Sequence, residues 1–289
     1  MQRPFRQVDV FTAQAFRGNP VAVVLDGAGL NDAAMQAFAN WTNLSETTFV
    51  LPATDPAADY QLRIFTPRTE LPFAGHPTLG SAHAVLEAGM AVPRGGVLTQ
   101  QCKVGLIAVS VADDWRTAGL SFQLPPHKID PAPDADDLVA AIGSAGAAAQ
   151  PPVIVNVGPR WVITQLACEA AVRGLTPDLP ALAAYDRRHG TTGLTVFAPL
   201  DGPAGAAGGI VVRSFAPTDG IAEDPVCGSG NGSVAAYRLA MGMMADGDAY
   251  VASQGREMGR DGVVRVAYRG GRIHVGGCCV TAISGTVEI

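Results

Sequence analysis

The chain is dominated by short segments in which apolar positions alternate with polar ones or run together between turn residues. This pattern predicts β-strands, because successive side chains of a strand point to opposite faces. In the first half, strands are expected at residues 8–11, 21–25, 47–51, 60–65, 97–101, 105–111 and 119–123. In the second half, they are expected at residues 153–157, 161–166, 194–198, 210–215, 263–268, 272–275 and 280–289.

Helical periodicity is limited to a few segments. Asn31 is expected to cap a helix that runs to about Asn40, with Ala34, Phe38 and Trp41 on its apolar face. Further helices are expected at about residues 78–87, after a Gly75-His76-Pro77 turn, at 134–142, from Thr176-Pro177 onward, where Thr caps and Pro occupies N1, and at 231–241. The proline-rich residues 125–133 predict a linker, and an Ala/Gly/Pro-rich loop is expected before residue 153.

The two halves of the chain resemble each other. Three matching stretches occur in the same order, and the middle one shares Arg, Phe and Pro at equivalent positions. The matches are residues 48–52 with 195–199, 60–67 with 210–217, and 70–76 with 223–229. This repeat predicts two pseudo-symmetric domains, with residues 1–124 and a C-terminal strand at about 280–289 in the first and residues 125–279 in the second.

Each half carries a loop that opens into a helix, at residues 74–78 and 227–232. Bare N–H groups and the helix dipole favour an anion at such a helix start. The second loop is neither a phosphate-binding P-loop nor a dinucleotide fingerprint, since no Gly-Lys-Ser/Thr ends it and the third glycine is missing. The repeat predicts that the two loops converge on a cleft between the domains, which suits a carboxylate or an enolate-like anion.

Composition restricts the class of protein further. The 289 residues are 48% hydrophobic and 16% charged, and a net charge of -6 without a basic patch argues against nucleic acid. We expect no signal peptide and no membrane span, since the least charged stretch, 190–212, is broken by Asp, Pro and Gly. The five cysteines lack a CxxC pattern, so neither structural zinc nor a disulfide framework is expected. A reduced cytoplasm is the simplest location.

The ordered motifs of the chain resemble the PhzF (phenazine biosynthesis isomerase-like) family, with diaminopimelate epimerase and proline racemase as wider relatives. The motifs are Phe16-Arg17-Gly18-Asn19-Pro20, Asn43-Leu44-Ser45-Glu46-Thr47, residues 63–67, Leu71-Pro72-Phe73-Ala74-Gly75-His76-Pro77 and residues 223–230. The resemblance implies an α+β, diaminopimelate-epimerase-like fold in which each domain is a mixed β-barrel around a central helix. It also implies a homodimeric enzyme that moves protons within a small carboxylate substrate without a cofactor.

Glu46 is the main candidate for catalysis. It stands just before an apolar strand, and the repeat places Gly193 opposite it, so a carboxylate is not required in both halves. From the residues alone, a carboxylate that caps a strand or pairs with an arginine is an equal alternative. The resemblance implies that Glu46 is the acid/base that takes a proton from one carbon and returns it to another, and burial in a cleft would raise its pKa.

The two helix-opening loops supply the candidate substrate-binding residues. By resemblance, His76 and Asp224 line the pocket, although a turn residue and a helix-start carboxylate are the plainer alternatives. Gly75, Gly228 and Ser229 would offer backbone amides to the anion.

Two further residues are secondary candidates. Ser45 flanks Glu46 and would orient it. Cys227 lies where diaminopimelate epimerase and proline racemase carry one of two catalytic thiols, but the repeat places Ala74 opposite it, so the thiol pair is absent. A helix N-terminus is expected to lower the pKa of Cys227 and make it reactive. A role in catalysis and a role as a small pocket residue are equally open.

Three functions are compatible with these residues. The first is an isomerase that uses Glu46 as its acid/base. The second is a two-base racemase or epimerase of an amino or hydroxy acid that uses Glu46 and Cys227. The third is a non-catalytic protein that binds small anions. No metal is expected, because the remaining histidines lack partners at metal-ligand spacing. Residues 254–260 are expected to form a tight turn that presents cations, with a structural role or a place at a dimer interface.

Overall fold

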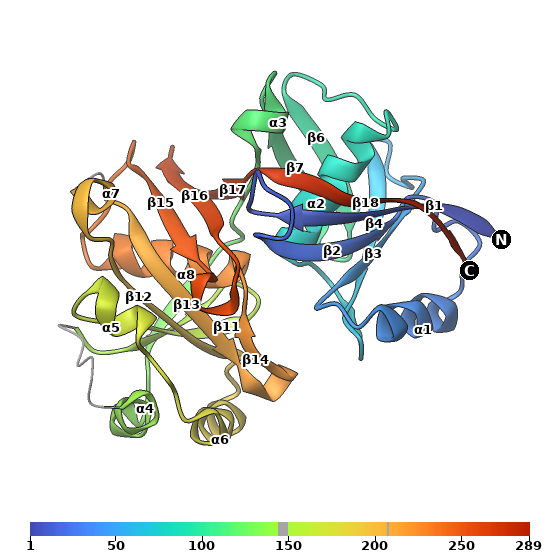
Figure 1. The fold of residues 1–289 in the computed structure, drawn as a ribbon. Helices are drawn as coiled ribbons and strands as arrows, with labels where there is room; N and C mark the ends of the chain where they lie inside the picture. Colours follow the sequence, from blue (N-terminus) through green and yellow to red (C-terminus); the bar gives the residue numbers. More distant parts are fainter. Residues whose placement is uncertain (144–149, 207) are drawn as a thin grey trace. The chain divides into compact units, whose positions relative to one another are not determined.

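The computed structural model describes residues 1–143, 150–206 and 208–289. The chain forms two compact units (Figure 1), one of Met1–Gln123 with Gly276–Ile289 and one of Leu124–Val275. Both are mixed α/β structures with parallel and antiparallel strand pairs. The Ala/Gly-rich loop expected before residue 153 lies largely outside the described residues. None of the helices in the described ranges combines the length and the apolar character that crossing a membrane requires.

The first unit contains one buried helix, α2, which packs against most of its strands. Its elements are β1 (Gln2–Val10), β2 (Asn19–Val24), α1 (Asp32–Thr42), β3 (Thr47–Leu51), β4 (Tyr60–Phe65), β5 (Glu70–Leu71), α2 (Gly75–Glu87), β6 (Val97–Cys102), β7 (Gly105–Val111), α3 (Trp115–Ala118), β8 (Leu120–Gln123) and β18 (Cys279–Glu288). Helix α2 contacts strands β1, β2, β3, β4, β6, β8 and β18. Ten of its residues are buried, so it is enclosed on nearly every side, as a core helix is.

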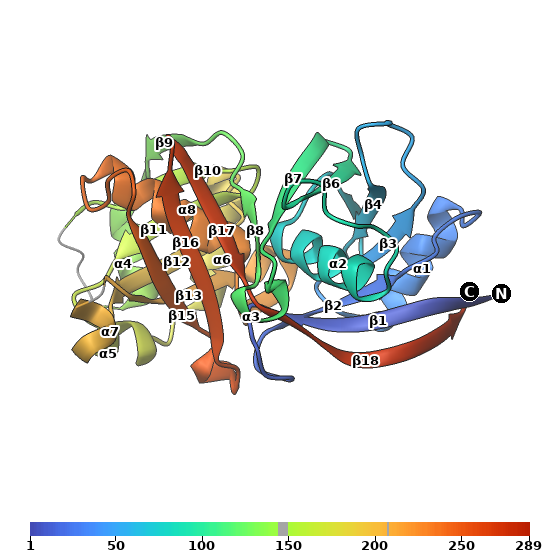
Figure 2. The same cartoon turned by 90° about the horizontal axis from the view of Figure 1, so that it is seen from above.

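The second unit has one buried helix, α8, and a separate layer of helices. Its elements are β9 (Lys128–Pro131), α4 (Ala135–Ile142), β10 (Val153–Asn156), β11 (Arg160–Gln165), α5 (Glu169–Arg173), α6 (Leu179–His189), β12 (Gly193–Pro199), α7 (Gly202–Ala206), β13 (Ile210–Ala216), η2 (Pro217–Asp219), β14 (Ile221–Asp224), α8 (Gly228–Ala240), β15 (Ala249–Gln254), η3 (Arg256–Met258) and β16 (Gly262–Arg269). Strand β17 (Arg272–Gly277) follows β16 and ends in the first unit. Figure 2 shows β15, β16 and β17 side by side.

Strand pairing repeats in the two units. The pairs β2–β3 and β11–β12 are parallel, β3–β4 and β12–β13 are antiparallel, and β4–β6 and β13–β15 are parallel again. Thr47 pairs with Phe65 in the first unit, and Leu194 pairs with Phe215 in the second. Glu46 and Gly193 are therefore equivalent positions, and the internal repeat of the sequence is seen in the strand register.

An equivalent bidentate arginine–glutamate pair, called the arginine fork below, occurs in both units. Arg63 donates to Glu70 from Nε (2.8 Å) and Nη2 (2.7 Å), and Arg213 donates to Glu223 at 2.8 Å from both atoms. Each guanidinium also lies 5.1 Å from the ring of a phenylalanine on its own strand. These bidentate pairs tie β5 to β4 and β14 to β13 just before the two buried helices begin. The Arg63 guanidinium lowers the pKa of Glu70, which also pairs with Lys103.

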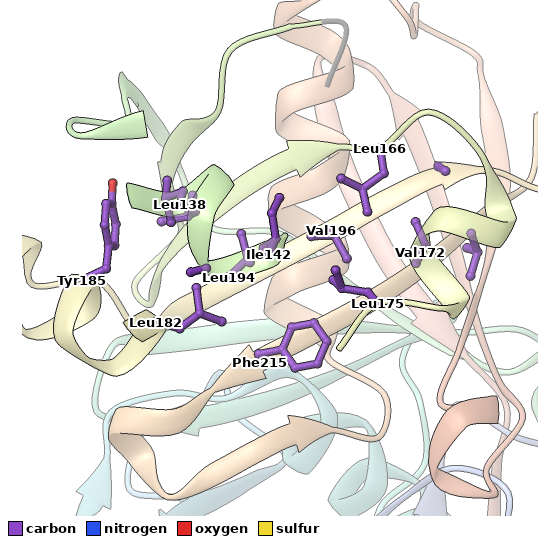
Figure 3. Packing of buried hydrophobic residues seen from close by; sticks show 14 of the residues in the cluster. Leu138, Ile142, Leu166, Val172, Leu175, Leu182, Tyr185, Leu194, Val196 and Phe215 are labelled. Atoms are coloured by element: carbon purple, nitrogen blue, oxygen red, sulfur yellow. The ribbon is translucent and has the colours of Figure 1, made fainter. Parts of the chain in front are cut away.

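The layer of helices in the second unit has its own hydrophobic core (Figure 3). Leu138 and Ile142 of α4, Leu182 and Tyr185 of α6, and Val172 of α5 pack against strands β11 to β13. Strand β12 is buried along Gly193–Ala198, because Leu194 and Val196 face this layer while Phe197 packs on Tyr237 of α8 at 5.5 Å. Burial on both faces explains why this strand has a continuous apolar run.

Several expected elements differ from the structure. In α1, Asn31 does cap the helix by accepting the Ala34 N–H at 2.8 Å, but Met35 and Ala39 are its buried residues. Trp41, expected on the apolar face, is 79% exposed and stacks on the outer side of Phe38. Phe38 is partly buried against the core, so the expected apolar face is correct at Phe38 and wrong at Trp41.

The termini of other elements also shift. The Gly75-His76-Pro77 turn is the first turn of α2, and α8 begins at Gly228 rather than near Asn231, because an extended N-cap residue precedes each helix. The expected linker 125–133 contains strand β9, which pairs with β10. Helix α6 is capped by the Asp178 carboxylate instead of Thr176. Strands β14 and β15 and helix α5 were not expected.

Asp186 in the last turn of α6 is a buried carboxyl group whose ionisation opposes folding. Burial raises its pKa to about 6, and Asp219 adds to the rise, although the Thr191 hydroxyl donates to it at 2.6 Å. The folded protein thus holds this proton more tightly than the unfolded chain, with its ordinary pKa of 3.8. Its contribution to stability therefore falls as the pH rises from about 4 to about 6.

Asp186→Asn is expected to be more stable than the wild type by about 1 kcal/mol at pH 7, because it removes the cost of a buried charge. The difference should disappear near pH 4, where Asp186 is protonated in both states. Urea unfolding at pH 4, 5, 6 and 7 measures it, with Asp137→Asn on the exposed face of α4 as the control. A gain that is the same at every pH would contradict this explanation.

Candidate active site

The first unit brings Glu46 and His76 together. Glu46 immediately precedes β3, and His76 is the second residue of α2. His76 Nε2 lies 3.4 Å from Glu46 Oε2, and the two side chains are 8% and 15% exposed. A carboxylate beside an imidazole at the start of a buried helix can exchange a proton with a bound molecule while most water is excluded.

Hydrogen bonds between β3 and α2 hold this pair in place. The Thr48 and Ser81 hydroxyls bond at 2.8 Å, and the Gln100 amide of β6 donates to Thr78 Oγ1 at 3.1 Å. Gly75 packs against Phe122, whose Cζ would lie 2.7 Å from a Cβ at this position. The helix therefore starts close to strand β8, and a larger residue than glycine would require the Phe122 ring or the first turn of α2 to shift.

Ser45 lies next to Glu46 in the sequence, and its Oγ is buried. The described part of the chain gives this hydroxyl no hydrogen-bond partner. A bond from Ser45 to the Glu46 carboxylate, which would orient the base, is therefore not part of the structure.

The second unit brings together Asp224, Cys227, Gly228 and Ser229 at the start of α8. Cys227 is the N-cap, and its Sγ accepts the Gly230 N–H at 3.2 Å. The Ser229 hydroxyl accepts the Trp161 indole N–H at 2.9 Å. Asp224 caps the preceding turn by accepting the Val226 N–H at 3.0 Å. These side chains are thus engaged in building the loop.

Cys227 does not have the reactive thiol expected from its place at a helix N-terminus. Its side chain is buried at 3% exposure, and burial raises the pKa of the thiol, with Asp224 adding to the rise. The hydrogen bonds from Ser229 and Gly230 act in the opposite direction and are outweighed. The thiol is therefore protonated near neutral pH and acts as a helix cap.

The position equivalent to Glu46 in the second unit cannot carry a side chain. A Cβ on Gly193 would lie 2.0 Å from the backbone oxygen of Phe215. The pair formed by Glu46 and His76 thus has no counterpart at Gly193 and Ser229, although the two helix starts are equivalent. The two units therefore share their backbone arrangement at this position, but only the first has the carboxylate and imidazole side chains.

Gln254 at the end of β15 was missed by the sequence analysis. Its Oε1 accepts the Cys227 N–H (3.1 Å) and the Asn231 amide (2.8 Å), and its Nε2 donates to the Asp224 carbonyl (3.1 Å). This fully buried amide ties three parts of the loop together. The only signal in the sequence was its place at the start of the 254–260 segment, which does form a tight turn with Gly255 and Gly259 at positive φ.

A metal centre is not apparent. Within residues 1–143, 150–206 and 208–289, no group of three or more His, Cys, Asp or Glu side chains is arranged to hold a metal ion. The convergence of the two helix starts on one cleft stays a prediction.

The chain is similar to known isomerases over most of its length. A trans-2,3-dihydro-3-hydroxyanthranilate isomerase from Pseudomonas aeruginosa is 36% identical over 259 residues, which cover 88% of this chain and 86% of the relative. The fold and the relatives together define an isomerase. More particularly, the chain belongs to the PhzC-PhzF family of phenazine biosynthesis-like proteins, whose model matches residues 8–285.

Two other likenesses extend over the whole chain. The Antisense-enhancing sequence 1 protein of Schizosaccharomyces pombe is 37% identical over 299 residues, which cover 98% of both chains. The crystal structure of a PhzF-family phenazine biosynthesis protein from Bacillus anthracis matches with a TM-score of 0.86 over 100% of both chains at 23% identity. At that identity the likeness shows the fold alone.

Proposed function

We propose that this protein is a cofactor-independent isomerase that moves a proton within a small carboxylic acid, with Glu46 as the acid/base. The observation that carries the proposal is the approach of His76 Nε2 to Glu46 Oε2 at 3.4 Å in a nearly buried setting. The ionised carboxylate would take a proton from a carbon of the substrate, and the protonated group would return it to another carbon. The cycle consumes no net proton or electron, although the proton held by Glu46 can exchange with the solvent before it is returned.

The start of α2 would stabilise the anion formed in between. Gly75 and His76 have backbone N–H groups in the first turn, whereas Pro77 has none. Such groups and the helix dipole favour negative charge where it develops on the substrate. His76 would hold the substrate by a hydrogen bond and keep Glu46 oriented.

A relative whose name states its reaction supports a proposal for the substrate class. That protein isomerises a dihydro-hydroxyanthranilate, which is a cyclic unsaturated acid with amino and hydroxyl groups. We propose a substrate of this kind here. The proposal includes a fold in which each unit's strands form a barrel around its buried helix, with Asp224, Gly228 and Ser229 completing the pocket. It also includes a homodimer in the cytoplasm.

Turnover in heavy water tests the reaction. Cyclic unsaturated amino and hydroxy acids are incubated with the protein in deuterium oxide, and proton NMR follows their carbon-bound hydrogens. We expect one acid to isomerise, with deuterium entering at the carbon that receives the proton in part of the product. If no candidate acid shows isomerisation or exchange, the proposed reaction is wrong.

Cys227→Ser is expected to keep turnover within about threefold of the wild type, since a protonated, buried cap is not a proton carrier. Serine also caps helix starts well, so the loop should survive. The measurement is the initial rate in both directions with the acid identified above. A fall of a hundredfold or more in a variant that still folds would favour the racemase alternative, in which Cys227 is the second base.

A further inference from the structure

The loop that joins β1 and β2 (dark blue in Figure 1) is held in a strained conformation. Phe11 and Phe16 have φ values of 65° and 70°, which cost residues other than glycine about 1 kcal/mol each. The buried Asp9 carboxylate accepts the N–H groups of Arg17 (2.9 Å) and Gly18 (3.1 Å). The 11–18 loop therefore keeps one shape at an energetic cost, which is common where a loop serves a binding site.

Contacts of α2 show which end of the unit this loop occupies. Thr48 bonds Ser81 at 2.8 Å. Glu46, just before β3 and two residues earlier in the chain, lies 3.4 Å from His76, five residues earlier on the helix. Moving toward the start of α2 therefore means moving toward the start of β3. Strand β2 is parallel to β3, and β1 is antiparallel to β2. The 11–18 loop thus lies at the same end of the sheet as Glu46.

A second contact shows which part of α2 lies beside the 11–18 loop. A Cβ on Gly80 would lie 2.4 Å from Val21 Cγ1 and 2.9 Å from Val10 Cγ2, so this glycine packs directly against both strands next to the loop. His76 is four residues before Gly80, on the same face of the helix and one turn closer to its start. His76 is thus one helical turn past the level of Val10 and Val21, on the side where β1 ends and the 11–18 loop begins.

Two arginines at this end of the unit, Arg68 between β4 and β5 and Arg17, form no ion pair in the described residues, and only Arg17 belongs to the strained loop. The Arg17 side chain is exposed. Arg63, by contrast, is tied to Glu70 and Asp32 at 2.7 Å each. The protein has a net charge of -6, so an anionic substrate needs a local positive charge to approach.

From these positions we infer that the 11–18 loop is a wall of the Glu46–His76 site and that Arg17 binds the carboxylate of the substrate. This rests on the proposed function and adds a specificity-determining residue to it. A guanidinium matches a carboxylate through two parallel N–H···O bonds. The carboxylate would be held at the rim by Arg17, while the carbon that loses its proton reaches Glu46.

Calorimetric titration with 2-aminobenzoate, a stable cyclic amino acid that cannot isomerise, tests Arg17 without turnover. Arg17→Ala is expected to raise Kd about tenfold or more, because a charged hydrogen-bonding partner is lost. Arg17→Lys should lie in between, since it keeps the charge and loses the fork. The control is Arg94→Ala: Arg94 is 64% exposed and lies before β6, at the opposite end of the strands.

Three results would overturn the inference: a Kd for Arg17→Ala within twofold of the wild type, equal weakening by Arg94→Ala, or no binding of millimolar 2-aminobenzoate to the wild type. Failure of the proposed function looks different. Glu46→Gln should bind 2-aminobenzoate normally and lose proton transfer. If Glu46→Gln still transfers protons, the role of Glu46 is wrong whatever Arg17 does.

Discussion

Replacing Glu46 by glutamine is expected to lower the rate of isomerisation by about a thousandfold or more, which is the usual contribution of a positioned acid/base. The amide has the shape of the carboxylate and can still bond His76, so the unit should fold. It cannot accept a proton from carbon, however, and deuterium from heavy water should no longer enter the product.

The matched control is Glu288→Gln, which makes the same change at the exposed end of β18 in the same unit. It should leave the rate unchanged. Rates are followed by NMR in heavy water, and folding is checked by circular dichroism. If Glu46→Gln keeps more than a tenth of the wild-type rate, another group carries the proton, and His76 would be the next to examine.

Replacing Arg213 by alanine is expected to destabilise the second unit by about 3–5 kcal/mol, the cost of breaking a buried ion pair. Arg213 is 8% exposed and Glu223 is 12% exposed, and the pair has two bonds of 2.8 Å. Arg213 Nη1 also donates to backbone carbonyls in α5 and just after it. The closest of these is the Leu175 carbonyl, at 2.6 Å. Alanine leaves all these acceptors without their donor.

Urea unfolding measures this loss, with the fluorescence of Trp161 as a probe inside the same unit. Arg188→Ala is the control, because Arg188 is 53% exposed and its two carboxylate partners are surface groups, worth at most about 1 kcal/mol. A double change of Arg213 to Met and Glu223 to Leu should recover part of the stability, since it removes both charges. Equal losses for Arg213→Ala and Arg188→Ala would show that the fork is not a main support of the unit.

Most strands could be predicted from the sequence, because their apolar runs are local and bounded by turn residues. The expected boundaries of β3, β4 and β7 are confirmed to the residue. Errors occurred where a distant segment decides the structure. Strand β9 is polar and proline-containing and exists because β10 pairs with it, and β15 forms because β13 and β16 lie on either side.

The residues of the candidate site could be predicted from the sequence, but their burial and pKa shifts could not. The repeat and the family motifs indicated Glu46, His76 and the two helix starts, and the structure brings Glu46 and His76 to within 3.4 Å. The same sequence suggested a reactive Cys227, which the structure overturns. The sign of that pKa shift depends on how many atoms from other segments surround the thiol, and no local pattern records this.

The sequence by itself determined most of the strands, the internal repeat and the family, since each is expressed in the order and spacing of side chains along the chain. Only the tertiary structure decided that Gly75 opens a helix against Phe122, that Gly193 has no room for a side chain, and that Gln254 supports a loop that begins thirty residues earlier at Asp224. These features follow from close approach between segments far apart in the chain. Desolvation, steric exclusion and hydrogen-bond pairing act only at that close range.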